Sequence, residues 1–421
     1  NLDKTNNLQL SGLIKFDELF ENFSLRFKDL ASETFRIDAK ISLNDLSLEI
    51  PQLNYFKEKN IKADVELHAD VSKLGHKIYN TSYSSGKTQI DLFFAHLNKK
   101  LQLTDFFEIN VKTFSKNIKN NDFKIKSNKQ KKHIVIEGEL FDAEPILKSL
   151  YKTDNKKIFS KDFNSEIKVN FDKATTGTND DVSSFGMIAS INKGSYNKLS
   201  LKGSFSKNEI IEMSIYQFDA NKKTLQVISD RARPFIKNFD FIKGFEDGKL
   251  EYESTIFNEG TNSNLLITDF KVSKVPALAQ LLTLASLQGI ADTLSGEGIR
   301  FDSFEMKSNS KDNVMNIEDA LAIGPAVSIL LEGYVDKGKT VSLRGTLVPA
   351  TKLNSIIASI PVVGDILVGK KTGEGVVGVS FKMKGSPKDI KTTVNPIKTL
   401  TPRFIVRAIE KMKKKNQKEA K

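Results

Sequence analysis

The 421-residue chain contains no cysteine, no tryptophan and only four histidines: His68, His76, His96 and His133. Without cysteine, disulfide bonds and thiolate metal sites are excluded. The histidines lie far apart and show none of the spacings that metal-binding motifs use. His68 falls on the polar side of an alternating segment, so we expect it to be exposed. The sequence therefore predicts no metal centre, no cofactor and no histidine-based catalysis.

A long apolar run is also missing. A helix that crosses a bilayer needs about 20 consecutive apolar residues, whereas the longest uncharged stretch, Val275 to Ala291, contains Gln280, Gln288 and Gly289. The sequence opens at Asn1 without an initiator methionine or a signal peptide. We expect this chain to be part of a longer protein, with any membrane anchor upstream of Asn1.

The formal net charge of +12 is spread over most of the chain rather than gathered in one patch. A nucleic-acid partner is the usual interpretation of such a charge, but scattered lysines do not form a binding stripe, and we predict no nucleic-acid partner. The one basic cluster lies at residues 403–421, which we expect to form a basic amphipathic helix and tail. This tail suits anionic lipids, or it is simply a solvated terminus.

Apolar and polar residues alternate along much of the chain, with period two. Examples are the segments from Ile37 to Leu43, Ile167 to Phe171, Leu199 to Phe205, Val341 to Leu347 and Val377 to Met383. This pattern is typical of antiparallel strands that have one wet face. Turn sequences separate the strands without long helices between them, which argues against a βαβ architecture. We predict a mainly β protein with a long, curled, mostly antiparallel sheet that forms an open groove or half-barrel.

Only a few short helices interrupt this pattern. Six segments have helical spacing or helix-start and helix-stop residues; they are residues 17–30, 143–151, 231–239, 276–294, 353–360 and 403–415. Most of the prolines and more than half of the glycines lie beyond residue 270. We therefore divide the chain into an elongated β region (1–270), a second β region with two apolar helices (271–402) and the basic tail (403–421).

One segment satisfies the P-loop pattern, in which glycines and a lysine cradle phosphates before a helix. Gly333 to Thr340 matches it letter for letter, but a plain alternating strand follows Thr340. We interpret the segment as a β-hairpin and predict no nucleotide binding. The pairs Gly296/Gly298 and Gly373/Gly375 indicate tight turns, and Asp180-Asp181 lies in a loop. No residue stands out as catalytic, so we do not expect an enzyme.

The segment Ala277–Leu294 is apolar over most of its circumference, so it must be buried on several sides or meet lipid. The ordinary alternative is a helix packed on the sheet, and the sequence leaves both open. The segment from Ile356 to Leu367 raises the same question. The candidate lipid-contacting residues are Leu278, Leu281, Leu282, Leu284, Leu287, Ile290, Leu294, Ile356, Ile357, Ile360 and Val363.

At these residues the chain resembles AsmA-like envelope proteins of the YhdP type. The resemblance is dense from about residue 230 to 409 and weak before 130. It rests on Pro276, Leu281-Leu282, Ala285-Ser286-Leu287, Gly289, Gly296, Gly298-Ile299, Phe301, Ala322-Ile323-Gly324-Pro325, Gly333, Gly345-Thr346-Leu347-Val348-Pro349, Leu353-Asn354, Ile360-Pro361, Gly364, Gly373-Glu374-Gly375, Val379, Gly385, Pro387 and Val394-Asn395-Pro396. The lysine-rich tail departs from the family, and no catalytic residue is carried over.

The resemblance implies a bridge-like protein of the Gram-negative periplasm, anchored in the inner membrane by a helix upstream of this chain. In that family a long β groove is thought to conduct phospholipid to the outer membrane, so the expected partners are phospholipid acyl chains and the two membranes. The alternative is a scaffolding protein that affects outer-membrane protein assembly and has a closed β-sandwich core.

Overall fold

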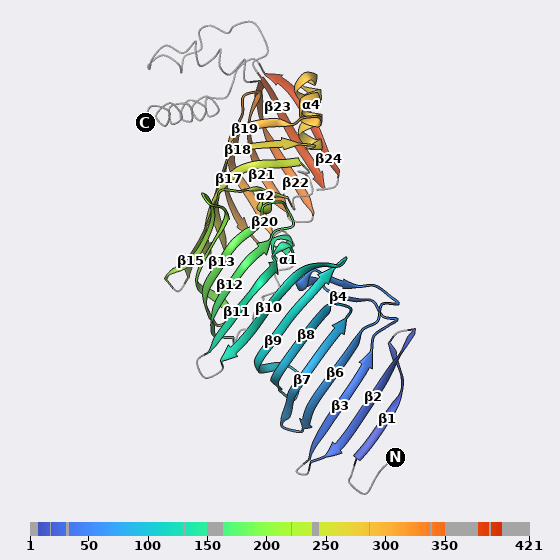
Figure 1. Ribbon diagram of the computed structural model, residues 1–421. Coiled ribbons are helices and arrows are strands. Elements are labelled where there is room, and N and C mark those ends of the chain that lie inside the picture. Colours follow the sequence, from blue (N-terminus) through green and yellow to red (C-terminus); the bar gives the residue numbers. More distant parts are fainter. Residues whose placement is uncertain are drawn as a thin grey trace, which may run out of the picture. The chain divides into compact units, whose positions relative to one another are not determined.

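The computed structural model describes residues 7–16, 18–30, 33–128, 132–149, 163–219, 221–237, 244–285, 287–336, 339–349, 378–386 and 389–397. The protein is mainly β, and 22 of its strands belong to one long sheet (Figure 1). The sheet is not closed, because among the described pairings β1 pairs only with β2 and β24 only with β23. The predicted fold class is confirmed.

The chain divides into two compact units between Ile215 and Tyr216. The boundary predicted at residue 270 lies inside a strand, β18. Unit 1 contains β1 (Asn7–Phe16), β2 (Leu19–Asp29), β3 (Thr34–Ser42), β6 (Asp64–Ser72), β7 (Gly75–Ser85), β8 (Thr88–Leu97), β9 (Leu103–Ser115), β10 (Ile118–Asn128), β11 (His133–Asp142), β12 (Ser165–Thr175), β13 (Val182–Asn192) and β14 (Ser195–Ser206).

The strands of unit 1 pair in chain order, and each described pairing is antiparallel except that of β11 with β12. Helix α1 (Glu144–Ser149) lies in the connection between those two strands, as a parallel crossover requires. Between β3 and β6 the chain leaves the sheet and forms a small hairpin, β4 (Leu48–Ile50) and β5 (Tyr55–Lys57), around the 3-10 helix η1 (Pro51–Leu53). Strand β15 (Glu209–Asp219) contains the division between the units.

Unit 2 is also a meander, with strands of similar length. They are β16 (Lys222–Ser229), β17 (Gly244–Phe257), β18 (Gly260–Ser273), β19 (Ile299–Lys311), β20 (Val314–Ile323), β21 (Val327–Asp336), β22 (Thr340–Pro349), β23 (Gly378–Ser386) and β24 (Asp389–Ile397). Its helices are α2 (Arg233–Ile236), α3 (Pro276–Leu284) and α4 (Gln288–Ser295). Strands β21 and β22 pair as a hairpin through Asp336 and Thr340, which confirms the interpretation of the P-loop match.

The helix predicted at residues 17–30 is wrong, because this segment is strand β2. Its apolar residues allow both periods: Phe23 and Phe27 are four apart, but Phe23, Leu25 and Phe27 also alternate. Pairing with β1 on one side and β3 on the other selects the strand. The helices predicted at 143–151 and 231–239 are confirmed as the shorter α1 and α2, whereas 353–360 and 403–415 lie outside the described residues.

The single helix predicted at 276–294 is also wrong, because the chain breaks it into α3 and α4 around residues 285–287. Leu282 and Leu294 are both completely buried. In one straight helix with about 100° per residue, side chains twelve positions apart would point roughly 120° away from each other. The break allows both leucines to face the protein.

Candidate functional site: the apolar face of the sheet

One face of the sheet in unit 1 carries a continuous apolar row that crosses its strands from β1 to β14. The row is defined by the register, since residues opposite each other on neighbouring strands share a face. It contains Leu10, Leu25, Ala39, Leu67, Thr81, Leu92, Ile109, Ile125, Ile136, Val169, Met187 and Leu201. Thr81 is its single polar member.

A second apolar row lies beside the first on the same face. It contains Gly12, Phe23, Ile41, Val65, Tyr83, Ile90, Val111, Phe123, Gly138, Phe171 and Phe185. On the other face, the row between these two is polar: Ser11, Ser24, Lys40, Glu66, Ser82, Asp91, Asn110, Lys124, Glu137, Asn170, Gly186 and Lys202. We call these the apolar face and the polar face.

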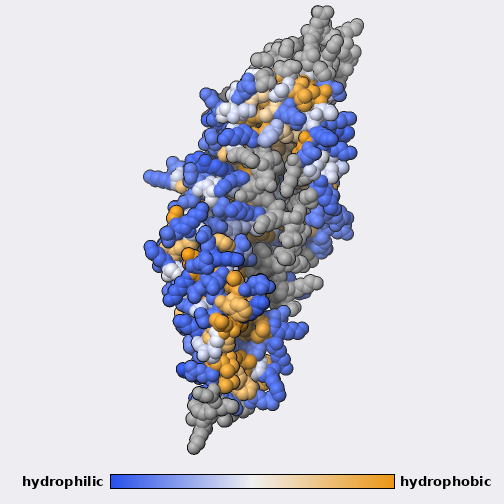
Figure 2. Space-filling model, turned by 90° about the vertical axis from the view of Figure 1, so that its right-hand side faces the viewer, coloured by the Kyte–Doolittle hydropathy of each residue, from blue (hydrophilic) through white to orange (hydrophobic). Residues whose placement is uncertain are grey.

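The apolar face is partly accessible. Leu10 is 44% exposed, and Leu25, Leu67, Leu92 and Ile109 are half-buried. Burial deepens toward β10–β13, where phenylalanines from neighbouring strands stack; the ring centroids of Phe141 and Phe171 are 4.9 Å apart. Figure 2 shows hydrophobic side chains gathered in one area over the N-terminal strands, with hydrophilic side chains on either side. Among the described residues, the only other sheet is the two-stranded β4–β5 hairpin, so they do not form a sandwich of two large sheets.

Residues 43–63, which we call the strap, cover one margin of the apolar face. Buried Glu21 anchors the strap where it leaves β3, because its carboxylate accepts hydrogen bonds from the backbone N–H groups of Asn44, Asp45 and Leu46 at 2.6–3.0 Å. Lys57 donates from its buried ammonium group to three backbone carbonyls of the same segment. Burial lowers the pKa of Lys57 below its ordinary value.

The far end of the strap is held by amide side chains of β10. Asn121 and Thr113 are completely buried, and Asn121 donates to the carbonyl oxygen of Leu53 at 2.8 Å. Asn54 donates to the carboxylate of Asp142, at the end of β11, at 2.8 Å. The strap is therefore held at two places, beside β3 and at the end of β11.

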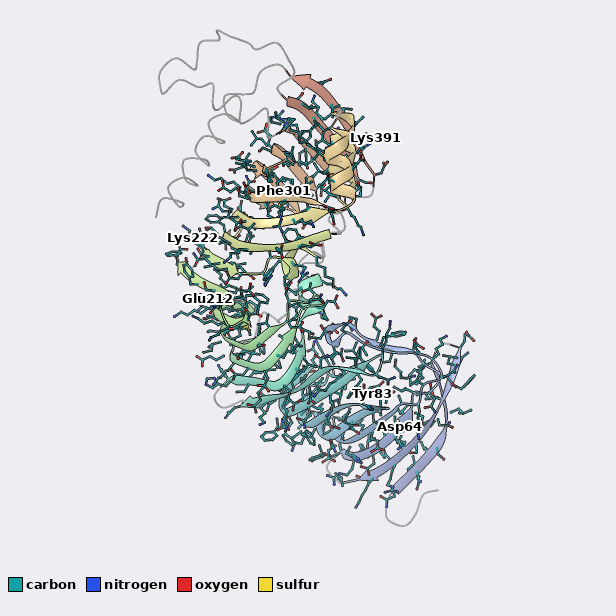
Figure 3. The ribbon with its side chains drawn as sticks, turned by 45° about the horizontal axis from the view of Figure 1, so that its top comes forward. Asp64, Tyr83, Glu212, Lys222, Phe301 and Lys391 are labelled. Atoms are coloured by element: carbon teal, nitrogen blue, oxygen red, sulfur yellow. The ribbon has the colours of Figure 1, made fainter. Side chains whose placement is uncertain are left out.

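Two tyrosines join the strap to the apolar face between its anchors. The hydroxyl groups of Tyr55, on β5, and Tyr83, on β7, are 2.8 Å apart and buried. Tyr83 is labelled in Figure 3. Burial raises the pKa of Tyr83, so the phenol stays neutral. Sequence reasoning missed the strap, although about twenty residues between two alternating segments are longer than most sheet connections.

Unit 2 has its own apolar face. One row crosses nine strands and contains Val227, Tyr252, Leu265, Met306, Ala320, Leu331, Gly345, Phe381 and Val394. The row beside it contains Leu250, Ile267, Phe304, Ala322, Ile329, Leu347 and Val379. Phe270 stacks between Phe245 and Phe301, with centroid separations of 5.4 Å on each side.

The helix pair of unit 2 contacts both its early and its late strands. Helix α3 lies against α4 and β24, and α4 lies against β18 and β19. Of the candidate lipid-contacting residues, Leu281, Leu282 and Leu294 are at most 2% exposed, Leu278, Leu287 and Ile290 are half-buried, and Leu284 is 46% exposed. Ile356, Ile357, Ile360 and Val363 lie outside the described residues. The three buried leucines therefore pack as core residues.

The polar face is tied by cross-strand ion pairs. Arg36 on β3 donates to Asp70 on β6 at 2.8 and 3.1 Å, and this bond lowers the pKa of Asp70. His68 is exposed, as expected, and lies 2.6 Å from Asp38. Within the described ranges, no group of three or more histidine, aspartate or glutamate side chains could hold a metal ion. No described helix is long and apolar enough to span a bilayer.

Comparison with known proteins gives no further assignment: no family model, no curated protein and no solved structure matches this chain.

Proposed function

We propose that this chain is a non-enzymatic periplasmic protein that binds phospholipid and conducts it between the inner and outer membranes along its apolar face. The observation that carries the proposal is the row from β1 to β14, which is apolar at every strand except β7 and whose N-terminal part is accessible. Such a row offers acyl chains a continuous surface rather than a closed pocket.

The energetics suit movement along the sheet. Each buried CH₂ group contributes about 0.8 kcal/mol, so an acyl chain gains affinity from contact length rather than from one polar anchor. Because neighbouring strands from β8 to β11 present similar side chains, Leu92, Ile109, Ile125 and Ile136, the binding free energy changes little from one of these strands to the next. A surface of this kind retains lipid without trapping it.

The first experiment measures lipid on the protein itself. We expect phospholipid to copurify with the chain, and a photoreactive amino acid at Leu92 to crosslink to acyl chains. Absence of bound lipid and of crosslinks, in protein purified without detergent, would contradict the proposal.

A matched pair of substitutions tests the face. Leu92→Arg places a charge in the accessible apolar row, whereas Ser82→Arg places the same charge in the polar row of the neighbouring strand. We expect Leu92→Arg to reduce uptake of fluorescent phospholipid about tenfold or more, and Ser82→Arg to leave it unchanged, with both variants folded by circular dichroism. Equal loss in both variants would show that the face does not bind the lipid.

Helix α3 allows a second test. Leu284 is the most exposed of the candidate residues that the structure describes, so Leu284→Asp is expected to leave folding intact and to reduce lipid uptake if this side of α3 meets acyl chains. Unchanged uptake would assign α3 a purely structural role.

A further inference from the structure

The two margins of the apolar face in unit 1 differ. The strap covers the margin at which β3 ends and β6 begins. The opposite margin, which we call the open margin, carries residues 30, 33, 73–74, 98–102, 132 and 193–194 in the turns that follow β2, β6, β8, β10 and β13, because alternate turns of a meander lie on the same side of the sheet. A hydrogen bond joins the turn at 193–194 to the segment that precedes β12, from the N–H of Gly194 to the carbonyl of Phe163 at 2.9 Å.

The open margin exposes leucines at positions where hairpins normally carry glycine or asparagine. Leu74 is 86% exposed in the two-residue turn between β6 and β7, and Leu101 is 68% exposed between β8 and β9. Leu103, beside it, is 51% exposed. The side chain of Ser72 holds this turn, because its hydroxyl donates to the carbonyl of Gly75 at 2.8 Å and accepts from the N–H of Leu74 at 3.3 Å. These bonds use only the backbone of Leu74, so they do not require an apolar side chain there.

Leu101 is held in an unfavourable conformation. Its φ of +59° lies in the left-handed region, which bulky residues adopt rarely. The side chain of Asn98 fixes the turn by accepting from the N–H groups of Lys100 and Gln102 at 2.9 and 3.0 Å, and the N–H of Leu101 bonds to the carbonyl of Asn98. A strained residue in a rigid turn is a reason to look for function; here the strain presents a leucine outward.

Positive charge accompanies these leucines. The described residues of the five turns include Lys73, Lys99, Lys100, Lys132 and Lys193, against one acidic residue, Glu33, which lies 2.8 Å from Lys73. Strands are about 4.8 Å apart, so neighbouring turns of this margin follow one another at intervals of roughly 10 Å. Lysines beside exposed leucines match the interface of an anionic bilayer, where apolar side chains insert and ammonium groups meet lipid phosphates.

We propose that the open margin of unit 1 docks on an anionic lipid bilayer, with Leu74 and Leu101 inserted and Lys73, Lys99 and Lys100 against the headgroups. Lipid would then pass sideways between the bilayer and the apolar face, since the strap covers the other margin. The passage of lipid between the bilayer and the apolar face rests on the proposed function. Docking of the open margin on a bilayer can be measured without any lipid transport.

Vesicle flotation of the whole chain tests the docking. We expect binding to phosphatidylcholine vesicles that contain phosphatidylglycerol, and weak binding to phosphatidylcholine alone. Two variants, Lys99→Glu with Lys100→Glu, and Leu74→Ser with Leu101→Asn, should each weaken binding about tenfold or more. Asparagine suits the left-handed conformation, so the leucine variant should remain folded.

The strap side provides matched controls. Ile118 is 71% exposed beside the turn at 116–117 on that side, so Lys116→Glu with Ile118→Ser makes a similar change away from the open margin. These controls should bind vesicles within about twofold of the unsubstituted chain. Because the basic residues at 403–421 also attract anionic lipid, all variants keep that segment.

Three results would overturn the docking proposal: no vesicle binding by the unsubstituted chain, no loss in the open-margin variants, or equal loss in the controls. Retention on an acidic protein surface without retention on vesicles would do the same. Uptake of a monomeric short-chain phospholipid separates the two proposals. It should persist in the open-margin variants, and its absence from the unsubstituted chain would refute the proposed function instead.

Discussion

Units 1 and 2 are built from the same kind of meander but cover their apolar faces differently. In unit 1 an excursion between β3 and β6 crosses one margin and leaves residues such as Leu10 and Leu92 accessible. In unit 2 a helical excursion between β18 and β19 places α3 and α4 against the sheet, and residues such as Leu250, Ile267 and Leu347 are at most 5% exposed. The two units therefore differ in the excursion that accompanies the sheet, a hairpin strap in unit 1 and a helix pair in unit 2.

The helix pair should give the largest stability effect. Leu282→Ala removes a completely buried side chain and should lower the free energy of unfolding by about 3 kcal/mol. Leu284→Ala, on the same helix at 46% exposure, should change it by less than about 0.5 kcal/mol. Urea denaturation measures both. Equal effects would mean that α3 does not cover the sheet as a core element.

Substitution of Glu21, the anchor of the strap, should have the second largest effect on stability. Glu21→Gln weakens three charge-assisted hydrogen bonds at a buried position, and we expect a loss of about 2 kcal/mol. Glu18→Gln is the control, since the Glu18 side chain is 94% exposed. Hydrogen exchange should show faster opening at residues 44–46 in Glu21→Gln alone. Protection equal to that of the unsubstituted chain would contradict the anchoring role.

The tyrosine pair should have a smaller effect. Tyr55→Phe leaves the hydroxyl of Tyr83 buried without this partner, at a cost of about 1 kcal/mol. A double-mutant cycle with Tyr83→Phe isolates the bond, and the double variant should lose less than the two single variants summed. Strict additivity would show that the two hydroxyls do not stabilise the strap together.

The smallest effect concerns the polar face at acidic pH. The hydrogen bond from Arg36 lowers the pKa of Asp70 in the folded state, so this carboxylate stabilises the protein above its unfolded pKa of about 4. The contribution is lost as pH falls through the lower, folded pKa. Stability between pH 5 and pH 2, measured by thermal unfolding, should therefore decline slightly less in Asp70→Asn than in the unsubstituted chain. Identical dependence of stability on pH in the two proteins would show that the Arg36–Asp70 pair does not contribute to the loss of stability at acidic pH.

Period-two alternation was sufficient to predict strands such as β3, β12, β14 and β22, because one polar and one apolar face leave a strand little freedom of register. It failed at residues 17–30, where Phe23 and Phe27 satisfy the helical and the extended period alike and only pairing with β1 and β3 decides. The sequence pattern also could not predict that Leu282 is buried and Leu284 exposed, because this difference depends on where α3 meets the sheet.

The sequence by itself determined the two-faced strands, the hairpin at the P-loop match and the absence of cysteine chemistry. These follow from side-chain type and local spacing. Only the tertiary structure decided that residues from β1 to β14 align in mostly apolar rows, that Glu21 and Lys57 hold a strap across one margin, and that Leu74 and Leu101 lie beside lysines on the other. Register and turn position are products of pairing between strands, which no pattern within a single strand records.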